Sequence, residues 1–211
     1  MDAAKAVNAE FTFACGTATV TYAEQVYHTV LIGSQCWLKE NLNVGTLING
    51  LYDQGTSCSS IQKWCWANNE SYCGGGYGGF YQWNQVMCGS ITPGVQGICP
   101  GGWHIPTDNE WYTLENYLKD PGQTCDPNRS SWDCSSTGAK LKSGGSSGFE
   151  AFFPGYCWYG SCSYRDAQAF LWSSSQDVSY ARIRHLDVGY DTIERSSQDK
   201  RAGYSVRCLK D

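Results

Sequence analysis

Between residues 11 and 38, the pattern of apolar and polar side chains is typical of β-strands. Residues 26–32 are apolar and β-branched, the chain turns at Gly33, and an apolar run resumes at residues 35–38. β-Branched runs on both sides of a short turn predict a β-hairpin. Residues 11–14 and 17–22 also alternate, so we expect a further strand pair before the hairpin.

The last forty residues carry a second set of strand patterns. Residues 170–174 form an apolar run that ends in serines, and residues 204–209 alternate strictly. Between them, residues 180–186 and 190–195 fit two more strands, followed by a polar turn at residues 197–200. Together these segments predict a small antiparallel sheet.

Two segments have the spacing of amphipathic helices. Apolar side chains recur every three or four positions over residues 80–87, which predicts a short helix. A second helix begins after Thr107, because Thr107 and Glu110 fit a capping box. It ends before Pro121, since the residue that precedes a proline disfavours the helical conformation.

The long segment over residues 46–79 is rich in cysteine and glycine and has no clear periodicity. We interpret it as an ordered insertion held by disulfides. Residues 139–141 and 149–153 are expected to be short elements that touch the core. Because no second block of periodic segments follows, we expect residues 1–211 to form a single α+β domain.

Composition and charge narrow the class of protein. Of the 211 residues, 41% are hydrophobic and 14% are aromatic, which is sufficient for a packed core. The net charge of −5 argues against nucleic acid as a partner, because phosphate binding needs a basic surface. No apolar run has the length of a membrane span, so we expect no membrane insertion, and residues 1–6 do not resemble a signal peptide.

Twelve cysteines in a loop-rich chain favour disulfides. Zinc is the alternative, but no two cysteines have the spacing of a zinc knuckle and the three histidines lie far apart. Three cysteine pairs flank short, turn-rich loops and are predicted to be bridged: Cys65 with Cys73, Cys125 with Cys134, and Cys157 with Cys162. Many disulfides imply an oxidising location, which means extracellular, on a cell surface or on a virus particle, unless the source is a hyperthermophile.

Three short patterns are typical of chemical sites. Residues 74–79 contain the glycine pattern of dinucleotide binding, but no strand precedes them and no acid follows at the required distance. Residues 144–148 contain the nucleophile-elbow pattern within a Gly/Ser loop. Asp126, Asn128 and Asp133 either supply oxygen ligands to a structural calcium ion or form turns with their own backbone. We expect no catalytic site. Apart from the structural calcium ion considered at these three residues, we expect no cofactor.

The region between residues 180 and 201 has an unusual mixture of side chains. Tyrosine and arginine give large contact areas and forked hydrogen bonds, while serine, glycine and aspartate adapt to many shapes, as in antibody paratopes. A solvated sheet edge is the alternative interpretation. The candidate ligand-binding residues are Tyr180, Arg182, His185, Asp187, Gly189, Tyr190, Asp191, Ser196, Ser197, Asp199 and Arg201.

Several stretches resemble the Fibrobacter succinogenes major paralogous domain. They are VYHTVLIGSQCWLKENLN at residues 26–43, CPGGWHIPTDNEW at residues 99–111, WSS at residues 172–174 and GYSVRCLKD at residues 203–211. That family is related to C-type lectins and to formylglycine-generating domains. The resemblance therefore implies a C-type lectin-like fold with two helices, small antiparallel sheets, long disulfide-tied loops, and paired N- and C-terminal strands.

Some domains of this kind are the variable proteins of diversity-generating retroelements, in which a reverse transcriptase mutates adenines near the end of the gene. The resemblance implies that the candidate residues are diversified positions that point to solvent. Those from Tyr180 to Asp199 are all reachable from an asparagine codon by changing adenines alone, whereas Glu194 and Gln198 are not. The positions that resemble a constant framework are Ala181, Arg184, Leu186, Arg195 and Gly203.

Under this resemblance the chain is a receptor-like binding protein and not an enzyme, and its partner is a protein or a cell-surface ligand. A flat, adaptable interface over residues 180–202 would make the contact. The alternatives are a constant, adhesin-like surface domain and, less favoured, an oxidase or hydrolase on the same scaffold. The sugar-binding tripeptides of calcium-dependent lectins are absent. Cys208 in the terminal strand looks like a disulfide partner, with Cys36 as the candidate.

Overall fold

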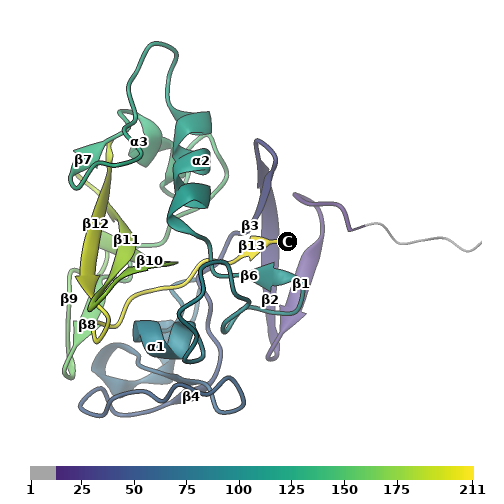
Figure 1. Cartoon of the computed structure of the whole chain (residues 1–211). Coiled ribbons are helices and arrows are strands. Elements are labelled where there is room, and N and C mark those ends of the chain that lie inside the picture. The colour runs from purple at the N-terminus through teal and green to yellow at the C-terminus, as the bar shows by residue number, and fades with distance from the viewer. Residues whose placement is uncertain (1–12) are drawn as a thin grey trace, which may run out of the picture.

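A five-stranded sheet brings together segments from both ends of the chain (Figure 1). The computed structural model describes residues 13–211. In order across the sheet, the strands are β1 (Thr19–Tyr22), β2 (Gln25–Ile32), β3 (Gln35–Leu38), β13 (Leu209–Lys210) and β6 (Trp103–His104). The predicted hairpin is formed by β2 and β3, and Leu209 pairs with Trp37, so strands near the two ends are adjacent as the resemblance implied.

The strand pair expected before the hairpin is only partly confirmed. Strand β1 falls within residues 17–22, but its partner is β2, with Val20 opposite Tyr27. Residues 11 and 12 lie outside the described residues, and Phe13 and Ala14 belong to no strand.

A four-stranded antiparallel sheet carries most of the candidate residues. Its strands, in order, are β10 (Gln168–Asp177), β11 (Tyr180–Asp187), β12 (Ile193–Asp199) and β7 (Trp132–Asp133). The turn predicted at residues 197–200 is wrong, because Ser197 and Gln198 pair with β11 in the sheet. Strand β11 supplies hydrogen-bond partners for the backbone N–H and C=O groups of this polar segment. The segment is therefore extended although its side chains have no strand pattern.

Helix α2 (Asp108–Leu118) forms as the sequence predicts. The Thr107 hydroxyl accepts a hydrogen bond from the Glu110 amide, and the Glu110 carboxylate accepts one from the Thr107 amide. This reciprocal pair is the capping box. Trp111 and Leu114 of α2 are fully buried in a core cluster that includes Trp37 of the five-stranded sheet and Leu186 of the four-stranded sheet. Helix α2 lies between the two sheets (Figure 1).

The first helix is shorter than expected, since α1 spans only Trp83–Val86. Phe80 instead forms a β-bridge with Trp64, and Cys88 has a φ of 52°, in the left-handed region that ends a helix. The third helix, α3 (Thr137–Leu141), contains the predicted short element at residues 139–141.

The insertion at residues 46–79 is ordered by short elements. Strands β4 (Thr46–Leu47) and β5 (Gln62–Lys63) pair in parallel. Two 3-10 helices follow, η1 (Trp66–Asn68) and η2 (Glu70–Cys73). This segment is thus built from tight turns and isolated pairings.

The final segment of the chain connects the two large sheets. After β12, the chain crosses to β13 in the five-stranded sheet (Figure 1). Strands β8 (Tyr156–Trp158) and β9 (Ser161–Ser163) form a hairpin that lies near the end of β12 (Figure 1). Residues 204–209 were predicted as one strand, but only Leu209 lies in β13. Tyr204 and Ser205 form single bridges with other parts of the chain, so this segment is buried between elements and is not a regular sheet strand.

All twelve cysteines form disulfides. The three predicted short-loop pairs are confirmed. The pairing of Cys208 with Cys36 is wrong: Cys36 is bonded to Cys15, and Cys208 to Cys99. Six disulfides indicate an extracellular or secreted protein. Across residues 13–211, no helix combines the length and the apolar character that crossing a membrane requires.

Candidate ligand-binding surface

The candidate residues lie on both faces of the β11–β12 hairpin, because successive side chains of a strand point to opposite sides. Arg182 and its cross-strand partner Ser197 share a face with Arg184, which contacts helix α2. His185 and Ser196 point to the other face. The candidate residues therefore form separate groups and not the flat surface that the sequence suggested.

One group surrounds the β11–β12 turn and consists of Asp187, Gly189, Tyr190 and Asp191. Tyr190 is 55% exposed and packs on Trp132, with 4.9 Å between ring centroids. The Asp187 carboxylate accepts hydrogen bonds from the Gln168 amide group and the Gly189 backbone, both at 2.8 Å. Burial opposes the charge on Asp187, but these hydrogen bonds outweigh it and lower the pKa of the carboxyl. The turn thus presents an exposed ring beside a fixed carboxylate.

A second group lies at the opposite end of the hairpin and consists of Tyr180, Asp199 and Arg201. Tyr180 is 52% exposed and pairs with Asp199. Arg201 donates to Asp199 through Nε (3.0 Å) and Nη2 (2.6 Å), and this pairing lowers the pKa of Asp199. The Arg201 guanidinium also lies over the Trp158 ring, 5.6 Å from its centroid.

His185 does not face solvent, although the sequence placed it among the surface residues. The residue is 8% exposed, and its ring lies between Phe170 and Trp132, with centroid distances of 4.1 and 4.8 Å. Nδ1 is 2.7 Å from Glu194 Oε2. Nε2 is buried without a hydrogen-bond partner in the described part of the chain. Phe170 and Trp132 therefore cover the His185 ring on this face of the sheet.

Arg182, Ser196 and Ser197 occupy the middle of the hairpin and are half-buried. The hydroxyl oxygens of both serines are buried, and neither has a hydrogen-bond partner within residues 13–211. These three residues therefore separate the two exposed groups at the ends of the hairpin.

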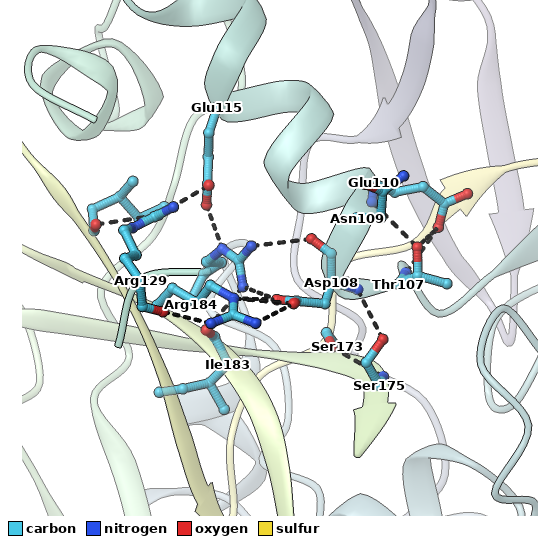
Figure 2. Close-up of polar contacts among 12 residues, drawn as sticks. Thr107, Asp108, Asn109, Glu110, Glu115, Arg129, Ser173, Ser175, Ile183 and Arg184 are labelled. Carbon is cyan, nitrogen blue, oxygen red and sulfur yellow. Dashed lines mark hydrogen bonds and ion pairs between the residues drawn. The ribbon is translucent and has the colours of Figure 1, made fainter. Parts of the chain in front are cut away.

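A buried ionic network holds the hairpin against helix α2 (Figure 2). Asp108 accepts from Arg184 Nη1 and from Arg195 Nη2, each at 2.7 Å. Glu115 accepts from Arg184 Nε and, at 2.9 Å, from Arg129 Nη2. Burial opposes the charge on Asp108, but the two guanidinium groups lower its pKa. Because Arg184 and Glu115 are fully shielded from water, each charge depends on its partners.

An aromatic cavity beside the hairpin was not predicted. Its volume is about 500 Å³, and Tyr156, Trp158, Tyr164, Phe170 and Tyr204 line it. The sequence signal was present, since Tyr156 and Trp158 alternate around a cysteine that closes a short loop. Only the fold brings them against Tyr204, which is almost fifty residues later.

The residues considered for calcium take part in a turn. The Asp126 amide donates to Asp133 Oδ2 and the Asn128 amide donates to Asp126 Oδ1, both at 2.8 Å. Glu115 lies within 4.8 Å of the sulfur atoms of Cys125 and Cys134, but these sulfurs form a disulfide and are not the thiolates that zinc requires.

Comparison with known proteins identifies a family. No curated protein and no solved structure matches this chain. The family model described as the Fibrobacter succinogenes major domain matches residues 30–210. This range extends from the β2–β3 hairpin to β13 and includes the whole β11–β12 hairpin. The chain therefore belongs to the Fibrobacter succinogenes major domain family.

Proposed function

We propose that this chain is a non-enzymatic binding protein that recognises a protein or cell-surface ligand through the β11–β12 hairpin. The observation that carries the proposal is a contrast within this hairpin. Tyr180 and Tyr190 are more than half exposed, whereas Arg184 and Arg195 are buried in ion pairs with helix α2. Exposed tyrosines on a rigid support give a large contact area at a small cost in conformational entropy.

The same contrast supports the finer proposal of a diversified surface on a C-type lectin-like scaffold, produced by a diversity-generating retroelement. Exchangeable positions must be accessible, while framework positions must maintain packing. Ala181 and Leu186 are fully buried, and a Cβ atom at Gly203 would lie 2.7 Å from the Trp64 ring. The framework positions are thus the ones at which exchange would disturb the core.

The disulfides support a binding protein over an enzyme that uses a cysteine thiol. An oxidase that uses a cysteine nucleophile needs an ionisable thiol. Every cysteine of this chain is paired in a disulfide, and all twelve lie within the described residues.

The test is to sequence the 3′ end of the gene and its flanks in several clones of the source population. We expect a near-identical downstream repeat, with substitutions at its adenines. Codons for the exposed Tyr180, Tyr190 and Asp191 should vary, and codons for the buried Arg184 and Arg195 serve as the matched controls and should not.

An invariant region without a repeat would contradict a diversified surface. The same hairpin would then belong to a constant, adhesin-like domain. Variation spread equally over buried Arg184 and exposed Tyr190 would also count against the proposal, because loss of a buried ion-pair partner is strongly destabilising.

A further inference from the structure

The aromatic cavity next to the hairpin has the properties of a built binding site. Its walls come from β8, β10, the end of β12 and the segment that follows β12. Its volume of about 500 Å³ falls in the range of roughly 300–1,000 Å³ that is usual for small-molecule sites. The cavity lies beside Asp199, and so it adjoins the second group of candidate residues.

Aromatic rings meet at the cavity in a fixed arrangement. Phe170 and Tyr204 are stacked, with 5.0 Å between centroids and 16° between planes. Tyr156 meets the edges of both rings, at 5.3 and 6.0 Å. Tyr164 stacks on Tyr156 at 6.0 Å and is 54% exposed. Because Phe170 is stacked between His185 and Tyr204, the rings that remain open to a ligand from solvent are those of Tyr156, Trp158 and Tyr164.

The walls are rigid because covalent and backbone links join them. The Cys157–Cys162 disulfide closes the β8–β9 hairpin. Cys157 and Gly203 exchange two backbone hydrogen bonds, at 3.0 and 2.8 Å, which attach β8 to the final segment. A site preorganised in this way loses little entropy on binding.

Polar groups at the cavity are free to bind a ligand. Tyr204 lines the cavity and is 95% buried, but its hydroxyl oxygen is not among the buried atoms that lack a partner within residues 13–211, so it is open to the cavity. Gln168 donates from its Nε2 to Asp187, and its Oε1 remains an available acceptor. Gln198 adds a second amide group at the rim. These groups suit a ligand with several hydroxyls.

The charges at the rim favour a neutral ligand. Asp199 is neutralised by Arg201 through two hydrogen bonds, at 3.0 and 2.6 Å. The Arg201 guanidinium lies 5.6 Å from the centroid of the Trp158 ring, so a cationic ligand at that ring would meet a like charge. Apolar ligands would leave the Tyr204 hydroxyl and the Gln168 oxygen unsatisfied, which is unfavourable.

We propose that the aromatic cavity binds the pyranose ring of a neutral saccharide without calcium. The C–H bonds on one side of a pyranose carry slight positive charge and are attracted to the negative face of an aromatic ring. The ring hydroxyls can then pair with Tyr204, Gln168 and Gln198. This inference goes beyond the proposed function, because the five aromatic residues that form the walls are not among the candidate positions on the hairpin.

The experiment is saturation-transfer-difference NMR on the intact protein in the presence of EDTA. The probes are methyl glycosides of glucose, galactose, mannose and N-acetylglucosamine, with tetramethylammonium as the cationic probe. We expect saturation of ring protons of at least one glycoside. Trp158→Ala and Tyr164→Ala should each weaken its binding about tenfold, as loss of one stacking surface implies. Tyr117→Ala is the matched control, since Tyr117 is 63% exposed on α2 and lies outside the cavity.

Three results would overturn the inference: no glycoside binds, both cavity variants bind as well as the unaltered protein, or tetramethylammonium binds in place of the glycosides. Circular dichroism of each variant checks that it is folded. The outcome is independent of the clone sequences, since a fixed saccharide site can exist beside an invariant hairpin. Diversified codons without glycoside binding would leave the proposed function standing and remove only the saccharide site.

Discussion

Asp108, the first residue of helix α2, connects the helix to three strands. Its carboxylate accepts hydrogen bonds from Arg184 in β11 and Arg195 in β12, and its amide donates to Ser175 Oγ in β10 at 3.0 Å. Both arginines are buried. Asp108 therefore holds both strands of the candidate hairpin against α2, and Glu115 adds a second contact to Arg184.

We predict that Asp108→Asn lowers the free energy of unfolding by about 3–5 kcal/mol, because it leaves the buried Arg195 guanidinium without an ionic partner and removes one of the two partners of Arg184. Urea unfolding followed by tryptophan fluorescence measures this change. Asp177→Asn, at an exposed position in β10, is the control and should change the stability by less than about 0.5 kcal/mol. Equal effects of the two substitutions would show that the network contributes nothing specific.

The ion pairs of Asp108 also predict that the stability of the protein depends on pH. The pKa of Asp108 is lower in the folded protein than its ordinary value of 3.8. Its stabilisation is therefore complete above pH 3.8 and disappears as the pH falls through the lower, folded-state pKa. The stability difference between the unaltered protein and Asp108→Asn should shrink over this acid range.

At the scale of whole elements, His104 joins a strand, a helix and the end of the five-stranded sheet. His104 Nε2 in β6 lies 3.1 Å from Glu110 Oε1 of α2, and His104 Nδ1 lies 2.7 Å from Oδ1 of Asp211, the residue after β13. Glu110 also belongs to the capping box. The hydrogen bond with Glu110 raises the pKa of His104 and, although burial acts in the opposite direction, Asp211 adds to the increase.

We expect this histidine to make stability depend on pH near neutrality. Because its pKa is raised in the folded state, its contribution is complete below pH 6.5 and decreases as the pH rises through the folded-state value. Thermal unfolding of the unaltered protein and of His104→Gln, from below pH 6.5 to about pH 9, measures the effect. The melting temperatures should converge as the pH rises, and parallel curves would refute the assignment.

At the scale of the whole molecule, the disulfide that spans the most residues joins the middle of the chain to its final segment. Cys99 and Cys208 are 109 residues apart in sequence, and both are fully buried. Cys208 lies in the segment between β12 and β13, next to Leu209 of β13. By contrast, Cys65 and Cys73 are separated by 8 residues.

Loop-closure entropy predicts that these two disulfides differ in their contribution to stability. Replacing Cys99 and Cys208 with alanine should cost about 5 kcal/mol, and replacing Cys65 and Cys73 about 2.5 kcal/mol, because the longer loop has more conformational freedom when unfolded. Chemical unfolding of the two double variants gives the comparison. A larger loss for the short loop would indicate that native-state packing outweighs the entropy of the unfolded chain.

The accuracy of the sequence predictions followed the range of the interactions involved. The capping box of α2 and the β2–β3 hairpin depend on residues only a few positions apart, and both were predicted. The strand through Ser197 was missed, because its polar residues are extended only by pairing with β11. His185 was placed at the surface from its residue type, whereas Phe170 and Trp132 cover it.

By itself the sequence determined the family, the mixed α+β character, the start of α2 and the three short-loop disulfides, because each of these is written in residues close to one another. Tertiary structure alone decided the partner of Cys208, the division of the candidate residues between two faces, and the aromatic cavity. These features arise from contacts between distant segments. Local pattern carries no information about which distant residue will be adjacent, so only the folded chain defines them.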